Sequence, residues 1–123
     1  MSTFSIRRRV LSFVFAFRGA KTMICTQHNA WIHLAATVAV VTGGFVCRVS
    51  GVEWAMLVVA VAIVWMAEAL NTALEFLADE VSEEKRERIG KAKDLGAFGV
   101  LICAVAAALI GGIVFLPHLI SAK

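Results

Sequence analysis

Five polar residues form one stripe on an otherwise apolar segment of the chain. The stripe consists of Glu68, Asn71, Thr72, Glu75 and Asp79, within the sequence AEALNTALEFLADE. At about 100° per residue these positions span an arc of roughly 100° on an α-helix, so three carboxylates, an amide and a hydroxyl share one face. An ionised carboxylate in lipid costs at least ~2.5 kcal/mol, and such residues normally face a protein interior or a water-filled cavity. We therefore expect the stripe to be the functional site.

The spacing of the three carboxylates favours divided roles. Glu68, Glu75 and Asp79 extend over about 16 Å of helix, which is too long for one ion. A glutamate in partly desolvated surroundings could act as a general base, whereas one nearer to water could stay ionised and hold Mg²⁺. Lys93 and Asp94, farther along the chain, add an ammonium for a phosphate and a carboxylate to orient that ammonium or a second group. This combination makes phosphoryl transfer chemically sensible.

Common nucleotide and metal motifs do not occur in the sequence. It has neither a GxxxxGK[ST] phosphate loop nor a protein-kinase signature, which excludes the ordinary nucleotide-binding folds as far as motifs can. The three cysteines show no CxxC spacing, so neither a zinc site nor a disulfide framework is indicated. His28 and His33 could be metal ligands, but His33 lies within a predicted span, where we interpret it as a hydrogen-bonded packing residue.

Membrane-spanning helices must position the stripe. Of the 123 residues, 60% are hydrophobic and 17% are charged, and the mean hydropathy is +0.84, which leaves too little polar surface for a soluble globule. Apolar runs long enough to cross a ~30 Å hydrocarbon core predict transmembrane helices at about residues 28–48, 53–78 and 95–117. The stripe lies in the C-terminal half of the second helix. Small residues in the third, including Gly96 and Gly99, are available for close helix packing.

The distribution of basic residues indicates the topology. Residues 1–21 alternate arginines and a lysine with phenylalanines and aliphatic residues, which predicts an amphipathic helix lying in the membrane interface. A second basic block lies in a predicted loop at residues 79–94. Because basic segments stay inside, we expect the N-terminus and this loop in the cytoplasm. The predicted fold class is an all-α membrane protein, a single domain over residues 1–123 with one surface helix and three transmembrane helices.

These motifs resemble those of a known family, the small bacterial membrane lipid kinases, which comprise integral-membrane diacylglycerol kinases and undecaprenol kinases. The similarity runs from about Phe13 to Pro117, and its core is ExxNxxxE from Glu68 to Glu75, Asp79 four residues later, and the segment AKD at 92–94. The resemblance implies transfer of the ATP γ-phosphate to a lipid hydroxyl, with Mg²⁺. It also implies a homotrimer in the bacterial plasma (inner) membrane with active sites between subunits, and no nucleic-acid partner.

The resemblance implies a role for each motif residue. Glu68 resembles the family's catalytic base, which abstracts the proton of the lipid hydroxyl, and Glu75 resembles its magnesium ligand. Asn71 is expected to contact the transferring phosphate or to fix the neighbouring carboxylates. Four further residues are expected to contact the nucleotide and its phosphates: Asp79, Lys93, Asp94 and, on the surface helix, Arg8.

One position departs from the family pattern. Family members usually have a glutamate before the first span, in a pattern like TEHNARIHL, where it supplies a second metal carboxylate. Here the segment reads TQHNAWIHL, so that Gln27 replaces the acid and Trp31 replaces a common basic residue. An amide oxygen is a neutral and weaker ligand for a hard cation. The resemblance therefore predicts either a metal site with Gln27 as a weak ligand and a lower affinity for Mg²⁺, or a site whose shell another group completes.

Alternative functions stay open at this stage. The exchange at Gln27 leaves room for a catalytically weakened or inactive lipid-binding homologue. Small proton-coupled transporters also place a membrane carboxylate in a chain of this size, but they need one essential acid and two or four spans. The acceptor is open between diacylglycerol and undecaprenol, although the segments HNAxIHL and FAFRG are more similar to the branch that contains undecaprenol kinases.

Overall fold

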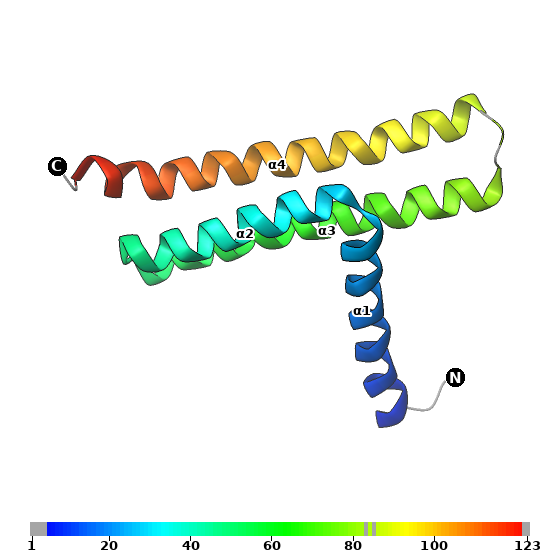
Figure 1. The fold of residues 1–123 in the computed structure, drawn as a ribbon, viewed down its shortest axis with the longest axis horizontal. Helices are drawn as coiled ribbons and strands as arrows, with labels where there is room; N and C mark the ends of the chain where they lie inside the picture. The colour runs from blue at the N-terminus through cyan, green and yellow to red at the C-terminus, as the bar shows by residue number, and fades with distance from the viewer. Residues whose placement is uncertain (1–4, 83, 85, 122–123) are drawn as a thin grey trace.

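The computed structural model describes residues 5–82, 84 and 86–121, which form four α-helices (Figure 1). The helices are α1 (Ile6–Thr26), α2 (His28–Cys47), α3 (Gly51–Val81) and α4 (Glu87–Ser121). This confirms the all-α class. Three of the helices, α2, α3 and α4, are long and apolar enough to cross a membrane.

The charged segment predicted as a loop at residues 79–94 is mostly helical. Helix α3 continues to Val81 and α4 begins at Glu87. The helix predicted at residues 1–21 begins at Ile6 and continues to Thr26, five residues farther than expected, and residues 1–4 of the prediction lie outside the described part of the chain. Hydropathy marks where a helix leaves an apolar layer, whereas backbone hydrogen bonding decides where it ends. Helices α3 and α4 therefore extend the site beyond the expected span ends.

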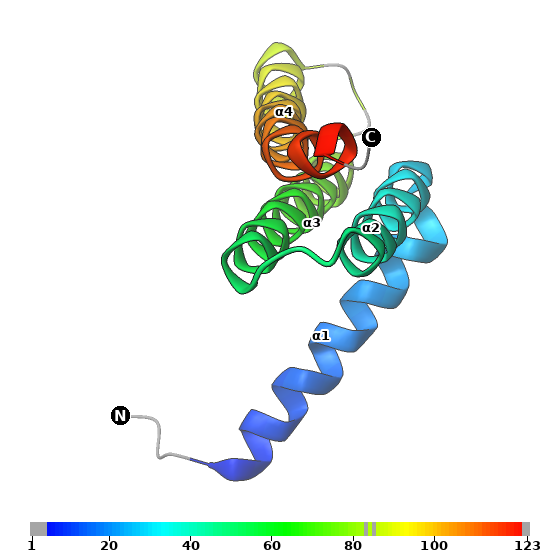
Figure 2. The same ribbon diagram turned by 90° about the vertical axis from the view of Figure 1, so that its left-hand side faces the viewer.

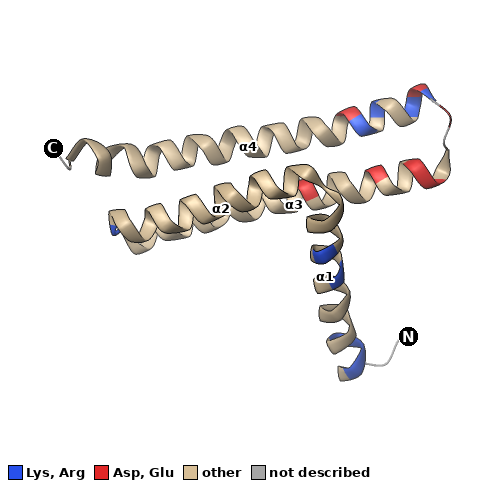
Figure 3. Cartoon of the chain, in the orientation of Figure 1, with Lys and Arg blue, Asp and Glu red and all other residues tan. Residues whose placement is uncertain are grey.

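The three long helices form a bundle from which α1 projects crosswise (Figures 1 and 2). Helices α3 and α4 run antiparallel and make the most extensive contact, while α2 packs against both of them. Charged residues gather on α1 and at the end of the bundle where α3 passes to α4 (Figure 3). The predicted topology, with this end in the cytoplasm and α1 on the membrane surface, stays a prediction.

A tight turn closes the opposite end of the bundle. Arg48 ends α2 in the left-handed region (φ 53°, ψ 47°), and its backbone N–H donates to the carbonyl of Phe45 at 3.2 Å. Ser50 then caps α3 in a reciprocal capping box with Glu53. The same glutamate contacts the imidazole of His118 on α4 at 3.0 Å. These contacts link the start of α3 to the end of α4 at the end of the bundle away from the stripe.

The core of a single chain is small. Leu57 and Val114 are almost completely buried between α3 and α4, and Val49 joins them from the turn. Most other large apolar side chains on the four helices are exposed. Apolar surfaces of this extent are stable in contact with lipid or with further protein. Water alone therefore does not surround this fold.

Candidate active site

The polar stripe lies on α3 with burial that decreases toward the charged end. Glu68 and Thr72 are buried, Asn71 and Glu75 are half-buried, and Asp79 is exposed. The side chain of Glu68 retains only 3% of its accessible surface. One chain therefore already encloses the deepest acid of the stripe, while the outer acids face solvent. Two glutamates seven residues apart thus lie in different surroundings, as divided roles require.

Glu68 is held without a hydrogen bond to one of its oxygens. Its Oε2 atom is buried and has no hydrogen-bond partner among the described residues. The imidazole Nε2 of His33, on α2, lies 3.7 Å from this oxygen, which is longer than a hydrogen bond. Buried polar atoms are nearly always paired, so an exception inside a polar cluster indicates a place where another group binds. A group with an acidic or hydroxyl proton would complete the environment of this carboxylate.

Asn71 links the deep acid to the outer part of the stripe. Its Nδ2 donates a hydrogen bond of 3.1 Å to Glu75 Oε1 and so holds a neighbouring carboxylate, while contact with a transferring phosphate stays a prediction. Its Oδ1 is buried and, within the part of the chain that is described, has no partner. Gly96 of α4 packs so closely on this amide that a Cβ atom there would collide with Oδ1. A residue as small as glycine is therefore needed at position 96 to leave room for the Asn71 side chain.

Gly96→Ala is expected to displace the Asn71 amide and with it Glu75. Since misplacing a catalytic group by about 1 Å can cost ~10²-fold in rate, we expect kcat for the reaction proposed below to fall between about tenfold and 10²-fold. The matched control is Gly99→Ala, one turn farther along α4, where an added Cβ meets no atom within 4 Å. Purified variants compared in one assay test this, and equal rates for both would contradict the account.

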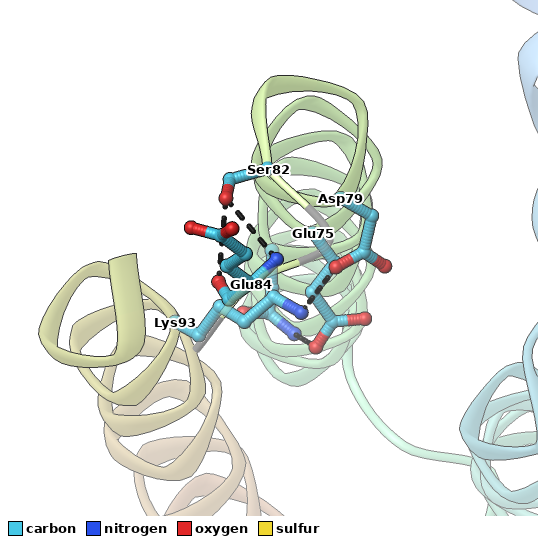
Figure 4. Close-up of polar contacts among 6 residues, drawn as sticks. Glu75, Asp79, Ser82, Glu84 and Lys93 are labelled. Carbon is cyan, nitrogen blue, oxygen red and sulfur yellow. Dashed lines mark hydrogen bonds and ion pairs between the residues drawn. The ribbon is translucent and has the colours of Figure 1, made fainter. Parts of the chain in front are cut away.

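Lys93 joins the two helices at the charged end of the stripe. Its Nζ contacts Asp79 Oδ1 at 2.5 Å, and Glu75 lies close enough to add to the attraction (Figure 4). Lys93 precedes the apolar run that begins at Leu95, so it lies outside the membrane-spanning part of α4. The hydrogen bond to Asp79 raises the pKa of Lys93, and the ammonium stays charged into the alkaline range. Asp79 is therefore the carboxylate that orients Lys93. Asp94, which follows Lys93 in the sequence, is exposed as well.

A polar cavity of about 500 Å³ lies where α3 ends and α4 begins. Its volume is in the range of sites that bind nucleotides and other small molecules. Charges of both signs surround it, which suits a phosphate together with the hydroxyls and ring of a nucleoside. The lining residues are Asp79, Ser82, Glu84, Arg86, Glu87, Ile89, Gly90 and Lys93.

A second, apolar groove of about 560 Å³ separates α1 from α3. On the α3 side, Thr72 is one of its lining residues. Because Thr72 lies one turn from Glu68, the groove passes along the buried end of the stripe. Its surface suits an acyl or isoprenoid chain, not a charged group. The other lining residues are Ala16, Gly19, Ala20, Thr22, Met23, Ile24, Trp65, Met66, Ala69, Ala73 and Phe76.

A single chain does not bring all of the predicted site residues together. Arg8 is exposed near the start of α1, the end of that helix that lies away from the stripe (Figure 3). Gln27, at the junction of α1 and α2, donates from its amide to the hydroxyl of Thr26 at 3.4 Å. The stripe, Lys93 and the two cavities thus form the assembled part of the site.

The oxygen atoms around Glu75 fit a magnesium ion bound together with phosphates. Among residues 5–82, 84 and 86–121, no three His, Cys, Asp or Glu side chains could hold a metal by themselves. Mg²⁺ is usually held by only one or two carboxylates plus water and substrate phosphates. The half-buried Glu75 carboxylate is a hard oxygen donor of this kind, and the Asn71 Nδ2 holds it, while the Asn71 Oδ1 is buried against Gly96.

Comparison of the sequence with known proteins finds one matching family and several relatives. The profile of a family described as prokaryotic diacylglycerol kinase matches residues 14–115. A diacylglycerol kinase of Synechocystis sp. is 35% identical over 113 residues, which are 91% of this chain but 65% of that protein. An undecaprenol kinase of Bacillus subtilis is 34% identical over 114 residues, or 93% of both chains. A diacylglycerol kinase of Escherichia coli K12 is 33% identical over 70 residues, or 57% of both.

Proposed function

Because the chain belongs to the prokaryotic diacylglycerol kinase family, we propose that it is a membrane lipid kinase that transfers the γ-phosphate of ATP to the hydroxyl of diacylglycerol or undecaprenol. The observation that supports this most directly is the graded stripe on α3. A buried carboxylate with an unpaired oxygen lies at one end of it, and a lysine beside a polar cavity lies at the other. Phosphoryl transfer from a cytoplasmic nucleotide to a membrane lipid needs both ends.

Glu68 takes the proton of the lipid hydroxyl in this proposal. The lipid oxygen forms a bond to the γ-phosphorus, the bond from this phosphorus to the β,γ-bridging oxygen breaks, and ADP leaves. The proton ends on the Glu68 carboxylate. A base whose neighbours exclude water is well placed for this step, because no water competes with the lipid hydroxyl for the carboxylate.

Lys93 and Asp79 bind the nucleotide end. The Lys93 ammonium reaches toward the polar cavity and can turn from Asp79 to a phosphate oxygen without leaving its helix. Asp94, next to it, and Arg8 of α1 would add contacts to the nucleotide. Mg²⁺, held by Glu75 with help from Asn71 and Gln27, would neutralise charge that develops on the phosphates.

The apolar groove between α1 and α3 is the proposed path for the acceptor lipid. It opens beside Thr72 and runs along the α3 face that precedes and follows Glu68. An acyl or isoprenoid chain in this groove would place a terminal hydroxyl near the stripe. We also propose a homotrimer in the bacterial inner membrane with its charged end in the cytoplasm. In a single chain Arg8 and Gln27 are not brought to the stripe, so a complete site would need a second subunit to supply part of it.

Purified protein incubated with [γ-³²P]ATP, Mg²⁺ and mixed bacterial lipids tests the function. We expect a labelled lipid phosphate, and we expect the label to disappear in Glu68→Ala. Competition between diacylglycerol and undecaprenol in the same reaction identifies the acceptor. If no acceptor becomes labelled, the kinase proposal fails.

Gln27→Glu is expected to raise ATP turnover and to lower the Mg²⁺ concentration needed for half-maximal rate. The variant replaces a neutral amide oxygen with a carboxylate, which is a stronger ligand for a hard cation. Rates measured across a magnesium titration check this, with Gln27→Asn as a control that changes the side chain but keeps the amide. A magnesium dependence that is the same in all three proteins would count against a role of Gln27 in metal binding.

A further inference from the structure

His33 is a polar side chain that α2 brings to the buried acid of the stripe. Its Nε2 lies 3.7 Å from Glu68 Oε2, and the two side chains retain 16% and 3% of their accessible surface. The oxygen that it approaches is the one that has no hydrogen-bond partner among the described residues. The imidazole is thus aimed at an unmet acceptor in a region with little water.

Neighbouring groups contact the backbone and the ring of His33. The hydroxyl of Thr37 donates to the backbone carbonyl of His33 at 2.7 Å, and the indole N–H of Trp65 donates to that hydroxyl at 2.9 Å. The Trp65 ring also contacts the imidazole edge to face, with centroids 6.3 Å apart. Trp65 lies one turn before Glu68 on α3. These contacts occupy the Thr37 hydroxyl and the backbone of His33, and they leave the ring nitrogens for other partners.

The arrangement differs from that of a packing histidine. A histidine that only fills space usually satisfies its ring nitrogens on a nearby carbonyl or hydroxyl. The hydroxyl next to His33 is instead used by Trp65 and by the main chain. A cavity of about 80 Å³, lined by His33 and Thr37 and otherwise mainly by apolar side chains, gives the ring room to move.

We propose that His33 is a positioning residue for phosphoryl transfer, which donates a hydrogen bond from Nε2 to Glu68 Oε2 and thereby directs Oε1 toward the lipid hydroxyl. The inference rests on the proposed lipid kinase function. The hydrogen bond requires that the distance shorten from 3.7 Å to the usual ~2.9 Å. The proton from the lipid goes to Glu68 Oε1, and the imidazole keeps its own N–H throughout.

Three variants separate this role from a structural one. His33→Leu removes the donor and is expected to lower kcat by about 10²-fold, because the base loses its orientation, with the KM for ATP unchanged. His33→Gln keeps an N–H donor and is expected to recover at least a tenth of the wild-type kcat. The matched control is His118→Gln, which breaks another contact between a histidine and a glutamate on two helices, at the far end of the bundle. Its kcat should stay within twofold of the wild type.

Two results would overturn the inference. One is a kcat of His33→Leu within twofold of the wild type. The other is an equal loss in His33→Leu and His33→Gln when both unfold at the wild-type temperature, because the donor would then not matter.

A measurement without turnover separates this inference from the proposed function. In protein labelled with ¹⁵N-histidine, Glu68→Gln should shift the Nε2 resonance of His33 and leave that of His118 unchanged. An inactive wild type that shows this shift would refute the kinase and keep the contact. An active wild type without the shift would keep the kinase and refute the contact between His33 and Glu68.

Discussion

Glu68→Gln is expected to lower the kcat for lipid phosphorylation by about 10²–10⁴-fold, the usual contribution of a general base. The amide has nearly the shape of the carboxylate and fits the same buried position, but it cannot accept the proton of the lipid hydroxyl. The KM for ATP should change little, because the nucleotide cavity lies at the other end of the stripe. Initial rates at saturating lipid, with varied ATP, measure both constants.

The control for this experiment is Thr72→Ser, on the same face of α3 and also buried. It keeps a hydroxyl and removes one methyl group, so it reports what a conservative change at this depth costs when no base is lost. We expect its kcat within a few-fold of the wild type. A Glu68→Gln variant as active as Thr72→Ser would show that the base is another group.

Much of this site could be predicted from the sequence because it lies on one helix. The period of the α-helix alone places Glu68, Asn71 and Glu75 on one face, and α3 has this face as expected. The hydrogen bond from Asn71 to Glu75 joins residues four apart, which are neighbours on any helix. The three long apolar helices follow from hydropathy in the same direct way.

Contacts between helices could not be predicted in this way. Asp79 and Lys93 are 14 residues apart and meet only because α4 begins soon after α3 ends, in a segment whose charges predicted a long loop. The approach of His33 to Glu68 depends on the angle between α2 and α3. No spacing in the sequence encodes that angle, so His33 was interpreted as a packing residue. Gly96 was expected to allow close packing, but its partner, Asn71, is known only from the fold.

Glu75→Gln tests the metal end of the stripe. The half-buried carboxylate accepts the Asn71 hydrogen bond and lies near Lys93, and it is the proposed magnesium ligand. Bound metal is worth several kcal/mol of charge stabilisation in such reactions, so we expect kcat to fall by about 10²–10³-fold at ordinary Mg²⁺ concentrations. Because an amide oxygen still binds the ion weakly, raising the Mg²⁺ concentration should restore part of the rate, which distinguishes this variant from Glu68→Gln.

The measurement is a magnesium titration of the rate in the wild type, Glu75→Gln and Glu80→Gln. Glu80 is an exposed acid near the end of α3, and its replacement removes the same unit of charge from the same helix. We expect the magnesium titration curve of Glu80→Gln to match that of the wild type. Calorimetry of ATP binding with and without Mg²⁺ adds a readout that does not depend on turnover, and only Glu75→Gln should lose the difference between the two conditions. If the loss of activity in Glu75→Gln did not respond to Mg²⁺ at any concentration, its carboxylate would serve to orient Asn71 and Lys93, and the metal would be held by other groups.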